Sequence, residues 1–424
     1  MRYKLSAPAT LHTTIQLPAS KSISNRALIL HALAQGHIAP SNLSDCDDTR
    51  VMIKALDGNP GHIDILAAGT AMRFLTAYLS VTPGTRIITG TERMQQRPIR
   101  ILVDALRELG AQIEYAGKEG FPPLRITGTE LTGEEISLAG NVSSQYISAL
   151  LMIGPILKNG LRLNLTGEII SRPYINLTLQ LMKEFGADAA WSSESSITVR
   201  PGKYRDIPFT VESDWSGASY WYQMVALIQD NEKKESTKTE IKLPGLLPHS
   251  YQGDSRGAEI FAKLGVHTTY TDQGVVLTKM GTPVTCLKED LADIPDLAQT
   301  FVVTCCLMNI PFRFTGLQSL KIKETDRIEA LKTELRKLGY LLADRGDSIL
   351  EWNGERCEPQ AHPVIATYED HRMAMAFAPA ALVLPEGIEI ADPQVVSKSY
   401  PHYWRDLRTA GFIIIDNEQL AIDN

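Results

Sequence analysis

The sequence predicts an α/β protein of two domains, each built from three similar α/β repeats. Two observations support this prediction. The chain has 424 residues, and a prior of roughly 150 residues per domain gives two or three domains. A repeat made of an amphipathic helix, a glycine and a β-rich segment also recurs about every 75 residues, a suitable size for a small α/β repeat.

The glycine of each repeat stands where a helix C-cap favours a left-handed residue. In the clear copies these glycines are Gly110, Gly186, Gly265, Gly339 and Gly411. A degenerate copy ends at Gly58, nearer to the next copy than the other spacings allow, so we expect the first repeat to be shortened. Six repeats divide most simply as three plus three.

The boundary between the domains is expected near residues 211–217. The segment from Tyr3 to Leu17 is predicted to be a first strand that belongs with the C-terminal half. The prediction is therefore one domain of residues 1–17 plus 211–424 and a second of residues 18–210. The chain would cross twice at one hinge, a geometry suited to domain closure.

Composition is that of an ordinary globular protein, with 44% hydrophobic and 21% charged residues. No segment has the length and apolar character of a membrane span, and the N-terminus lacks the apolar core of a signal peptide, so we expect a cytoplasmic protein. A net charge of −7 argues against nucleic acid or an anionic membrane as the main partner. The cysteines have no disulfide or metal-ligand spacing and are interpreted as small buried hydrophobes.

The stretch 18–26 reads as the start of a helix that continues through an apolar segment. Ser20 or Ser22 can cap it, and helical spacing puts Ser22 beside Arg26. Together with Lys21, these groups place cations and hydroxyl donors at the positive end of a helix, which favours binding of a phosphate or carboxylate. A capped basic surface helix is the alternative, because no Walker-type glycine spacing is present.

Four further anion-receptive helix starts are predicted in this half. They are Gly69 and Thr70 before a helix at 71–80, Arg97 before Pro98, the run Ser143, Ser144 and Gln145, and the pair Ser171 and Tyr174. Each has an ordinary turn or a serine cap as its alternative. Their number in one half favours a shared binding function.

The second half supplies acids and more cations. Asp293 and Asp296 precede an apolar helix, where capping is the favoured interpretation from the residues alone. Lys323 and Arg327 are predicted to share a helix face with Glu324 beside them, either as a solvated ion-pair face or as a site that binds an anion and moves a proton.

Asp370, His371 and Arg372 come directly before a segment that is apolar all round. A histidine and an arginine at the start of a buried helix indicate a ligand or a cleft. Lys398 carries no signal by itself.

The order and spacing of six motifs resemble the enolpyruvyl transferases, most closely the branch that acts on shikimate 3-phosphate. The motifs are residues 21–26, 68–73, 97–99, 142–145, 323–327 and 370–374. The resemblance covers nearly the whole chain and implies an inside-out α/β barrel of two domains, with helix N-termini directed into an interdomain cleft that holds the active site. It implies no metal and no organic cofactor, and we expect a monomer.

The implied reaction transfers the enolpyruvyl group of phosphoenolpyruvate to the 5-hydroxyl of shikimate 3-phosphate, with release of phosphate. The resemblance assigns proton acceptance from the hydroxyl to Asp296, proton transfer at the methylene carbon to Glu324, and assistance to the leaving phosphate to Lys21. It assigns phosphoenolpyruvate binding to Lys21, Gly69, Arg97, Gln145, Arg327, Arg372 and Lys398. It assigns shikimate 3-phosphate binding to Lys21, Ser22, Arg26, Ser143, Ser144, Gln145, Ser171, Tyr174, Asp296 and Lys323. Supporting positions are Thr70, His371 and Ser319.

The sequence departs from the family pattern at three positions. Ala67 and Ser319 replace asparagines and Phe74 replaces a proline, which puts the shape of the 68–73 loop and the response to inhibitors in question. One alternative is the sister reaction on UDP-N-acetylglucosamine, but the cysteine typical of that family is missing from residues 92–96. The other alternative is a non-catalytic relative, which would have no need of Asp296 and Glu324.

Overall fold

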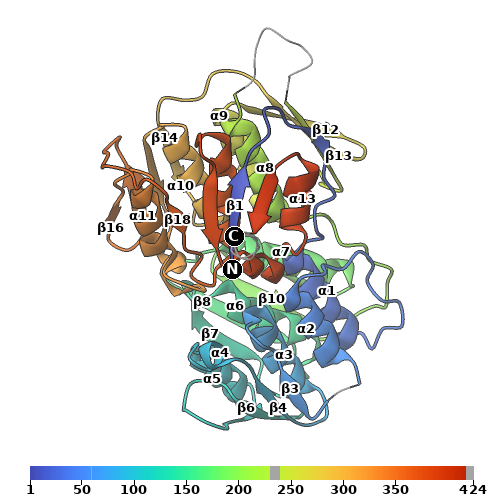
Figure 1. Ribbon diagram of the computed structural model, residues 1–424. Helices are drawn as coiled ribbons and strands as arrows, with labels where there is room; N and C mark the ends of the chain where they lie inside the picture. Colours follow the sequence, from blue (N-terminus) through green and yellow to red (C-terminus); the bar gives the residue numbers. More distant parts are fainter. Residues whose placement is uncertain (59, 230–238, 417–424) are drawn as a thin grey trace. The chain divides into compact units, whose positions relative to one another are not determined.

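The structure is a computed structural model that describes residues 1–58, 60–229 and 239–416 (Figure 1). Its internal contacts divide the chain into two compact bodies. The first body is Met1–Pro18 with Ser213–Asn424, and the second body is Ala19–Glu212. Among the described residues, no helix combines the length and apolar character needed to cross a membrane.

The described residues of the first body form three four-stranded sheets. In spatial order their strands are β2 (His12–Thr14), β11 (Glu240–Pro244), β13 (Gly274–Lys279) and β12 (Val266–Thr271); β14 (Leu287–Asp290), β15 (Phe312–Thr315), β17 (Ile349–Trp352) and β16 (Ala343–Arg345); and β18 (Val364–Ile365), β19 (Ile388–Ala391), β1 (Arg2–Ser6) and β20 (Ile413–Asp416). Their α-helices are α8 (Trp215–Leu227) and α9 (Gly257–Lys263), α10 (Ala298–Leu307) and α11 (Arg327–Lys337), and α12 (His371–Phe377) and α13 (Tyr403–Thr409). Short 3-10 helices are η3 (Gly253–Arg256), η4 (Pro295–Leu297), η5 (Gln318–Ile322), η6 (Ala378–Leu382) and η7 (Pro393–Lys398).

Every sheet of this body has one parallel pair of strands followed by antiparallel pairs. In the second sheet, for example, β14 runs parallel to β15 with Leu287 opposite Phe312, whereas β17 runs antiparallel to both β15 and β16. In this sheet α10 follows β14 and α11 follows β15, so the parallel pair is joined by a helical crossover connection.

The N-terminal strands complete two sheets of the C-terminal half. β1 lies between β19 and β20, where Figure 1 shows it in blue among red strands, and β2 pairs with β11. The expectation of a single strand over 3–17 was wrong, because residues 7–11 are irregular and the two strands enter different sheets. Pro8 lies in this break and cannot donate to a strand ladder.

The second body contains two sheets with the same strand order. They are β3 (His62–Asp64), β4 (Gly84–Thr89), β6 (Leu124–Gly128) and β5 (Gln112–Tyr115), and β7 (Glu135–Ala139), β8 (Leu161–Thr166), β10 (Ser196–Val199) and β9 (Ala189–Trp191). The helices are α1 (Lys21–Leu33), α2 (Asp47–Leu56), α3 (Gly69–Val81), α4 (Glu92–Gln95), α5 (Arg100–Glu108), α6 (Ser144–Ile153), η1 (Gly154–Ile156) and α7 (Arg172–Glu184).

The opening repeat keeps its two helices, α1 and α2, but lacks the sheet. Within the described part of the chain its segment takes part in an isolated bridge between Ser41 and Thr210 rather than in a four-stranded sheet. The expected shortening of the first repeat is therefore confirmed, and the lost residues are those of its strands.

The repeat glycines have the predicted conformation. Gly110, Gly186, Gly265, Gly339 and Gly411 follow α5, α7, α9, α11 and α13, and their φ angles lie between 85° and 106°. Only glycine adopts this region without steric cost, so the five helices end at equivalent positions.

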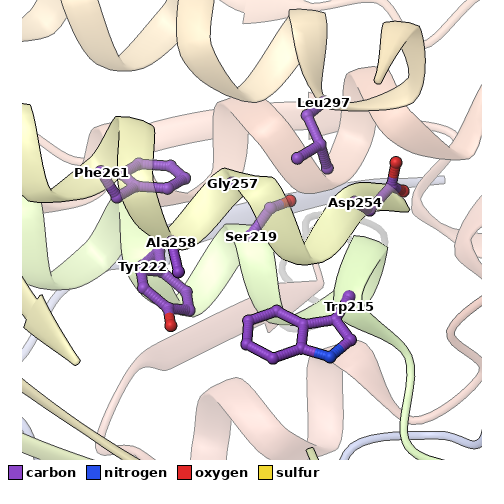
Figure 2. Close-up of a pocket in the computed structure, with 8 residues that line it drawn as sticks. All are labelled: Trp215, Ser219, Tyr222, Asp254, Gly257, Ala258, Phe261 and Leu297. Carbon is purple, nitrogen blue, oxygen red and sulfur yellow. The ribbon is translucent and has the colours of Figure 1, made fainter. Parts of the chain in front are cut away.

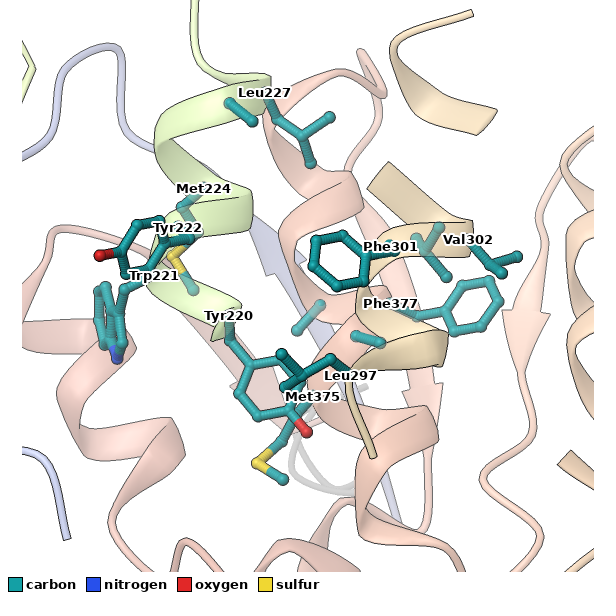
Figure 3. Close-up of a cluster of buried hydrophobic side chains, with 14 of the residues drawn as sticks. Tyr220, Trp221, Tyr222, Met224, Leu227, Leu297, Phe301, Val302, Met375 and Phe377 are labelled. Atoms are coloured by element: carbon teal, nitrogen blue, oxygen red, sulfur yellow. The ribbon is translucent and has the colours of Figure 1, made fainter. Parts of the chain in front are cut away.

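Helices occupy the interior of each body. In the first body α10 packs against both α8 and α12, and Figure 3 shows their apolar side chains converging, including Tyr220, Phe301 and Phe377. In the second body α1, α3 and α6 pack against one another in the same way. Cys46, Cys305 and Cys306 are buried, but Cys286 is exposed and Cys357 half-buried, so the interpretation of all cysteines as buried hydrophobes was wrong for these two.

Candidate active site

The predicted residues lie mostly at the starts of helices. α1 begins at Lys21, α3 at Gly69, α6 at Ser144, α11 at Arg327 and α12 at His371. The first backbone N–H groups of a helix have no partner within the helix, and the helix dipole is positive there. The repeat therefore presents one anion-receptive end after another.

Ser20, rather than Ser22, caps α1, because Ser20 Oγ accepts a hydrogen bond from the Ile23 N–H at 3.5 Å. Lys21 Nζ lies 3.5 Å from Asp48 Oδ2, on the first turn of α2. Asp48 could not be predicted from the sequence, because it is distant from Lys21 in the chain and no local pattern marks their pairing.

Arg26 is buried among three helices of the second body. Its guanidinium donates to Thr178 Oγ1 at 2.7 Å, to Ser148 Oγ at 3.1 Å and to the Ser22 carbonyl at 2.9 Å. Burial lowers the pKa of Arg26 to about 10. Phe74, which stands where the family pattern has a proline, packs against this arginine. Its ring is buried, and the Arg26 guanidinium lies 5.2 Å from the ring centroid.

Gly69 allows two arginines to approach the start of α3. A Cβ at Gly69 would lie 2.5 Å from Arg73 Nη1 and 2.7 Å from Arg97 Nη1, so a side chain would displace both guanidiniums. Arg73 donates to the Gly69 carbonyl at 2.8 Å, and Gln145 Nε2 donates to Thr70 Oγ1 at 3.1 Å. The start of α3 therefore brings together Gly69, Thr70 and Arg97, and Gln145 joins them through its hydrogen bond to Thr70.

The predicted serines stand at two more helix starts. Ser143 caps α6 by accepting a hydrogen bond from the Gln145 N–H at 3.4 Å, and Ser144 is the first helical residue. Ser171 precedes α7 with a left-handed φ of 56°, and the Tyr174 carbonyl accepts a hydrogen bond from Arg26 at 3.5 Å. These residues, with those around Lys21 and Gly69, form the second-body set.

The first-body set is centred on Asp296 in η4. Arg372 Nη2 donates to Asp296 Oδ2 at 2.8 Å, Arg327 Nη1 donates to Oδ1 at 3.2 Å, and Lys323 Nζ lies 3.5 Å from Oδ1. Burial acts to raise the pKa of Asp296, but the charges of Arg372, Lys323 and Arg327 outweigh it and hold the pKa well below its usual value. The favoured capping interpretation was wrong, because α10 has no side-chain cap.

Glu324 and Asp370 extend this network. Glu324 accepts a hydrogen bond from Arg327 Nη2 at 2.9 Å and lies 3.0 Å from Lys398 Nζ. Asp370 caps α12 through the Arg372 N–H at 2.9 Å and also accepts from Arg327 Nε at 2.7 Å. The sequence analysis gave Asp370 no role, although its position before the helix was a usable capping signal.

The helix predicted to carry both Lys323 and Arg327 begins later in the structure than expected. Residues 323–326 are not helical, because Asp326 accepts hydrogen bonds from the Ile328 and Glu329 N–H groups and α11 starts only at Arg327. Arg327 therefore reaches Glu324 from the first helical turn. His371 is buried with Nδ1 3.8 Å from Asp370 Oδ1, and Ser319 lies half-buried in η5.

A further buried acid, Asp254 in η3, was not identified from the sequence. Its carboxylate accepts a hydrogen bond from the Ser216 hydroxyl, and Figure 2 shows it at one end of a small, mostly apolar pocket lined also by Phe261 and Leu297. Burial, together with the negative charge of Asp296, raises the pKa of Asp254 to about 7.

Comparison with known proteins identifies the family of this chain. The family described as EPSP synthase (3-phosphoshikimate 1-carboxyvinyltransferase) matches residues 5–58 and 59–407. A 3-phosphoshikimate 1-carboxyvinyltransferase of Bacteroides fragilis is 72% identical over 419 residues, covering 99% of this chain and all of that one. One of Shewanella pealeana is 36% identical over 424 residues, covering 93% of this chain and 96% of that one.

A solved structure, the EPSP synthase from Acinetobacter baumannii, has the same fold with a TM-score of 0.77 at 21% identity, covering 98% of this chain and 100% of that one. The resemblance inferred from the motifs is thereby confirmed. The chain belongs to the EPSP synthase (3-phosphoshikimate 1-carboxyvinyltransferase) family.

Proposed function

We propose that this chain transfers the carboxyvinyl group of phosphoenolpyruvate to the 5-hydroxyl of shikimate 3-phosphate. This is the activity of its family, and it belongs to aromatic amino-acid biosynthesis. The observation that carries the assignment is Asp296, an ionised, half-buried carboxylate surrounded by Arg372, Arg327 and Lys323.

Both substrates are multiply anionic, so bringing them together requires compensating charge. We assign the carboxylate and phosphate of phosphoenolpyruvate to the cations Arg327, Arg372, Lys398, Lys21 and Arg97, with Gly69 and Gln145 beside them. We assign shikimate 3-phosphate to the second-body hydroxyls and cations, namely Lys21, Ser22, Arg26, Ser143, Ser144, Gln145, Ser171 and Tyr174, and to Lys323 and Asp296. Thr70, His371 and Ser319 remain supporting positions.

The proton steps follow from the two acids. In the addition step the 5-hydroxyl oxygen bonds to C2 of phosphoenolpyruvate, its proton passes to Asp296, and the methylene carbon takes a proton from Glu324. In the elimination step Glu324 removes a proton from the new methyl group, the C2–O bond to phosphate breaks, and the proton on Asp296 leaves with the phosphate, assisted by Lys21.

The cations around Asp296 also regulate its basicity. While Arg372, Arg327 and Lys323 bind it, Asp296 is ionised but a weak base. Substrate anions compete for these three cations, so their binding raises the basicity of Asp296 at the moment when the hydroxyl must lose its proton. The cations thus keep Asp296 ionised in the free protein, and Asp296 becomes a stronger base when the substrates bind.

The test is phosphate release from phosphoenolpyruvate in the presence of a chelator, with either shikimate 3-phosphate or UDP-N-acetylglucosamine as acceptor. We expect release with shikimate 3-phosphate alone. Release with UDP-N-acetylglucosamine, or silence of the folded protein with both acceptors, would contradict the assignment.

A further inference from the structure

Residues 366–370 form a turn between β18 and α12, and its backbone is strained. Tyr368 and Glu369 have φ angles of 54° and 57°, a left-handed conformation that is unfavourable for residues other than glycine. The turn leads directly to Asp370 and Arg372. Two consecutive residues in this conformation persist only where their surroundings fix them.

The side chain that holds the turn is Glu334 of α11, which is fully buried. Its Oε1 accepts a hydrogen bond from the Tyr368 hydroxyl at 2.7 Å, and its Oε2 accepts one from the Ala366 N–H at 3.0 Å. Lys337 Nζ donates to the same Oε2 at 2.6 Å and to the Val364 carbonyl at 2.9 Å. One carboxylate therefore connects α11 to the strand and to the strained turn that follows it.

α11 attaches to this segment at two points. Arg327, on its first turn, donates to Asp370 Oδ2 at 2.7 Å, and Glu334 binds the residues just before Asp370. Residues seven apart share a helix face and lie about 10 Å apart along the axis. The segment that ends in Arg372 is thus fixed at both ends against one rigid helix.

We infer that Glu334, acting through the Tyr368 hydroxyl, is a positioning residue for Arg372 and, through Arg372, for phosphoenolpyruvate. The inference rests on the proposed function. Arg372 must reach both the carbonyl and the carboxylate of Asp296, at 3.1 Å and 2.8 Å, and this double contact depends on the direction in which α12 begins. Without the hydrogen bonds from Glu334, the turn can leave its left-handed conformation, and Arg372 then points in another direction. Lys323 and the second-body set are held by other elements and should not move.

The test compares Tyr368→Phe and Glu334→Gln with Tyr270→Phe, a control at an exposed tyrosine of β12. We expect Tyr368→Phe to raise the KM for phosphoenolpyruvate about 3- to 10-fold, the effect of one lost part-buried hydrogen bond. The KM for shikimate 3-phosphate should change by less than about twofold. Glu334→Gln should have a larger effect, because an amide has only one accepting oxygen for the three bonds and lacks the charge that pairs with Lys337, and the control should match the parent.

Two results would overturn the inference. One is an unchanged KM for phosphoenolpyruvate in Tyr368→Phe, a variant conservative enough to fold even if Glu334→Gln does not. The other is an equal rise of both KM values with a lowered melting temperature, which would indicate a merely structural role. A failure of the proposed function is seen separately, as absence of phosphate release by the unaltered protein.

Discussion

At the scale of single residues, the pKa values of two acids of the first body, Asp296 and Asp254, are shifted in opposite directions. Asp296 is surrounded by cations that hold its pKa well below the usual value, whereas burial and the Asp296 charge raise the pKa of Asp254 to about 7. Ser216 and Arg372 act to lower the pKa of Asp254, and Asp214 acts to raise it. Ionised Asp254 is therefore unfavourable in the folded protein.

Asp254→Asn should make the protein more stable at high pH. Because the folded pKa of Asp254 lies above the unfolded value, its contribution to stability falls as pH rises from about 4 to about 7, by up to about 4 kcal/mol. The asparagine variant lacks this loss. Urea unfolding at pH 5 and pH 8 should show a free-energy advantage of the variant that is larger at pH 8.

Asp272→Asn is the matched control, because Asp272 is an exposed acid in the turn between β12 and β13. It should give the same free-energy difference from the parent at both pH values. If the difference in unfolding free energy between Asp254→Asn and the parent were also the same at both pH values, Asp254 would not be the group that destabilises the protein at high pH.

The predictable residues were those marked by local sequence. Lys21, Gly69 and Ser143 stand at helix starts, where the local residues alone predict an anion-receptive end, whereas the role of Asp296 was predicted only from the family resemblance. Asp48, Asp254 and Glu334 were missed because each acts on partners that only tertiary structure brings near.

At the scale of elements, the left-handed glycine after the second helix of each repeat is the most regular feature of the chain. Gly110 offers the cleanest test, because its φ is 106° while an added Cβ would meet its nearest neighbour only at 3.9 Å. Any cost of a side chain at this position is therefore conformational rather than a clash.

Gly110→Ala should lower the free energy of unfolding by about 1–2 kcal/mol, the cost of a left-handed alanine. Gly202→Ala in the same body is the control, since nothing lies within 4 Å of its added Cβ and its φ carries no such strain. Denaturant unfolding measures both. Equal stabilities of the two variants would refute the view that the helix end requires glycine.

Element boundaries were less predictable than element types. The helix expected over 323–327 starts later because the Asp326 side chain binds the N–H groups of Ile328 and Glu329. The strand expected over 3–17 is two strands that pair in different sheets. In both cases the sequence pattern that predicted the element continues past its observed end. The hydrogen bonds of Asp326 set the start of the helix, and Pro8 lies in the break between the two strands.

At the scale of the whole molecule, the repeat explains why the site residues are so widely spaced in the sequence. Six first helices, α1, α3, α6, α8, α10 and α12, form the interiors of the two bodies, and most predicted residues lie at the starts of helices. The opening repeat keeps α1, and with it Lys21 and Arg26, although its sheet is missing from the described residues.

Most of the groups assigned to shikimate 3-phosphate belong to the second-body set, whereas the proton of its 5-hydroxyl is assigned to Asp296. Asp296→Asn removes the base but keeps the size of the side chain. A lost general base typically costs 10²- to 10⁴-fold in rate, whereas most of the acceptor's contacts stay intact.

The most direct measurement is therefore kcat and shikimate 3-phosphate affinity of Asp296→Asn, with Asp293→Asn as the matched control. We predict that Asp296→Asn loses at least about 100-fold in kcat and keeps its affinity within about tenfold, while the control behaves like the parent. A variant that turns over normally, or one that loses binding and turnover together, would contradict the account.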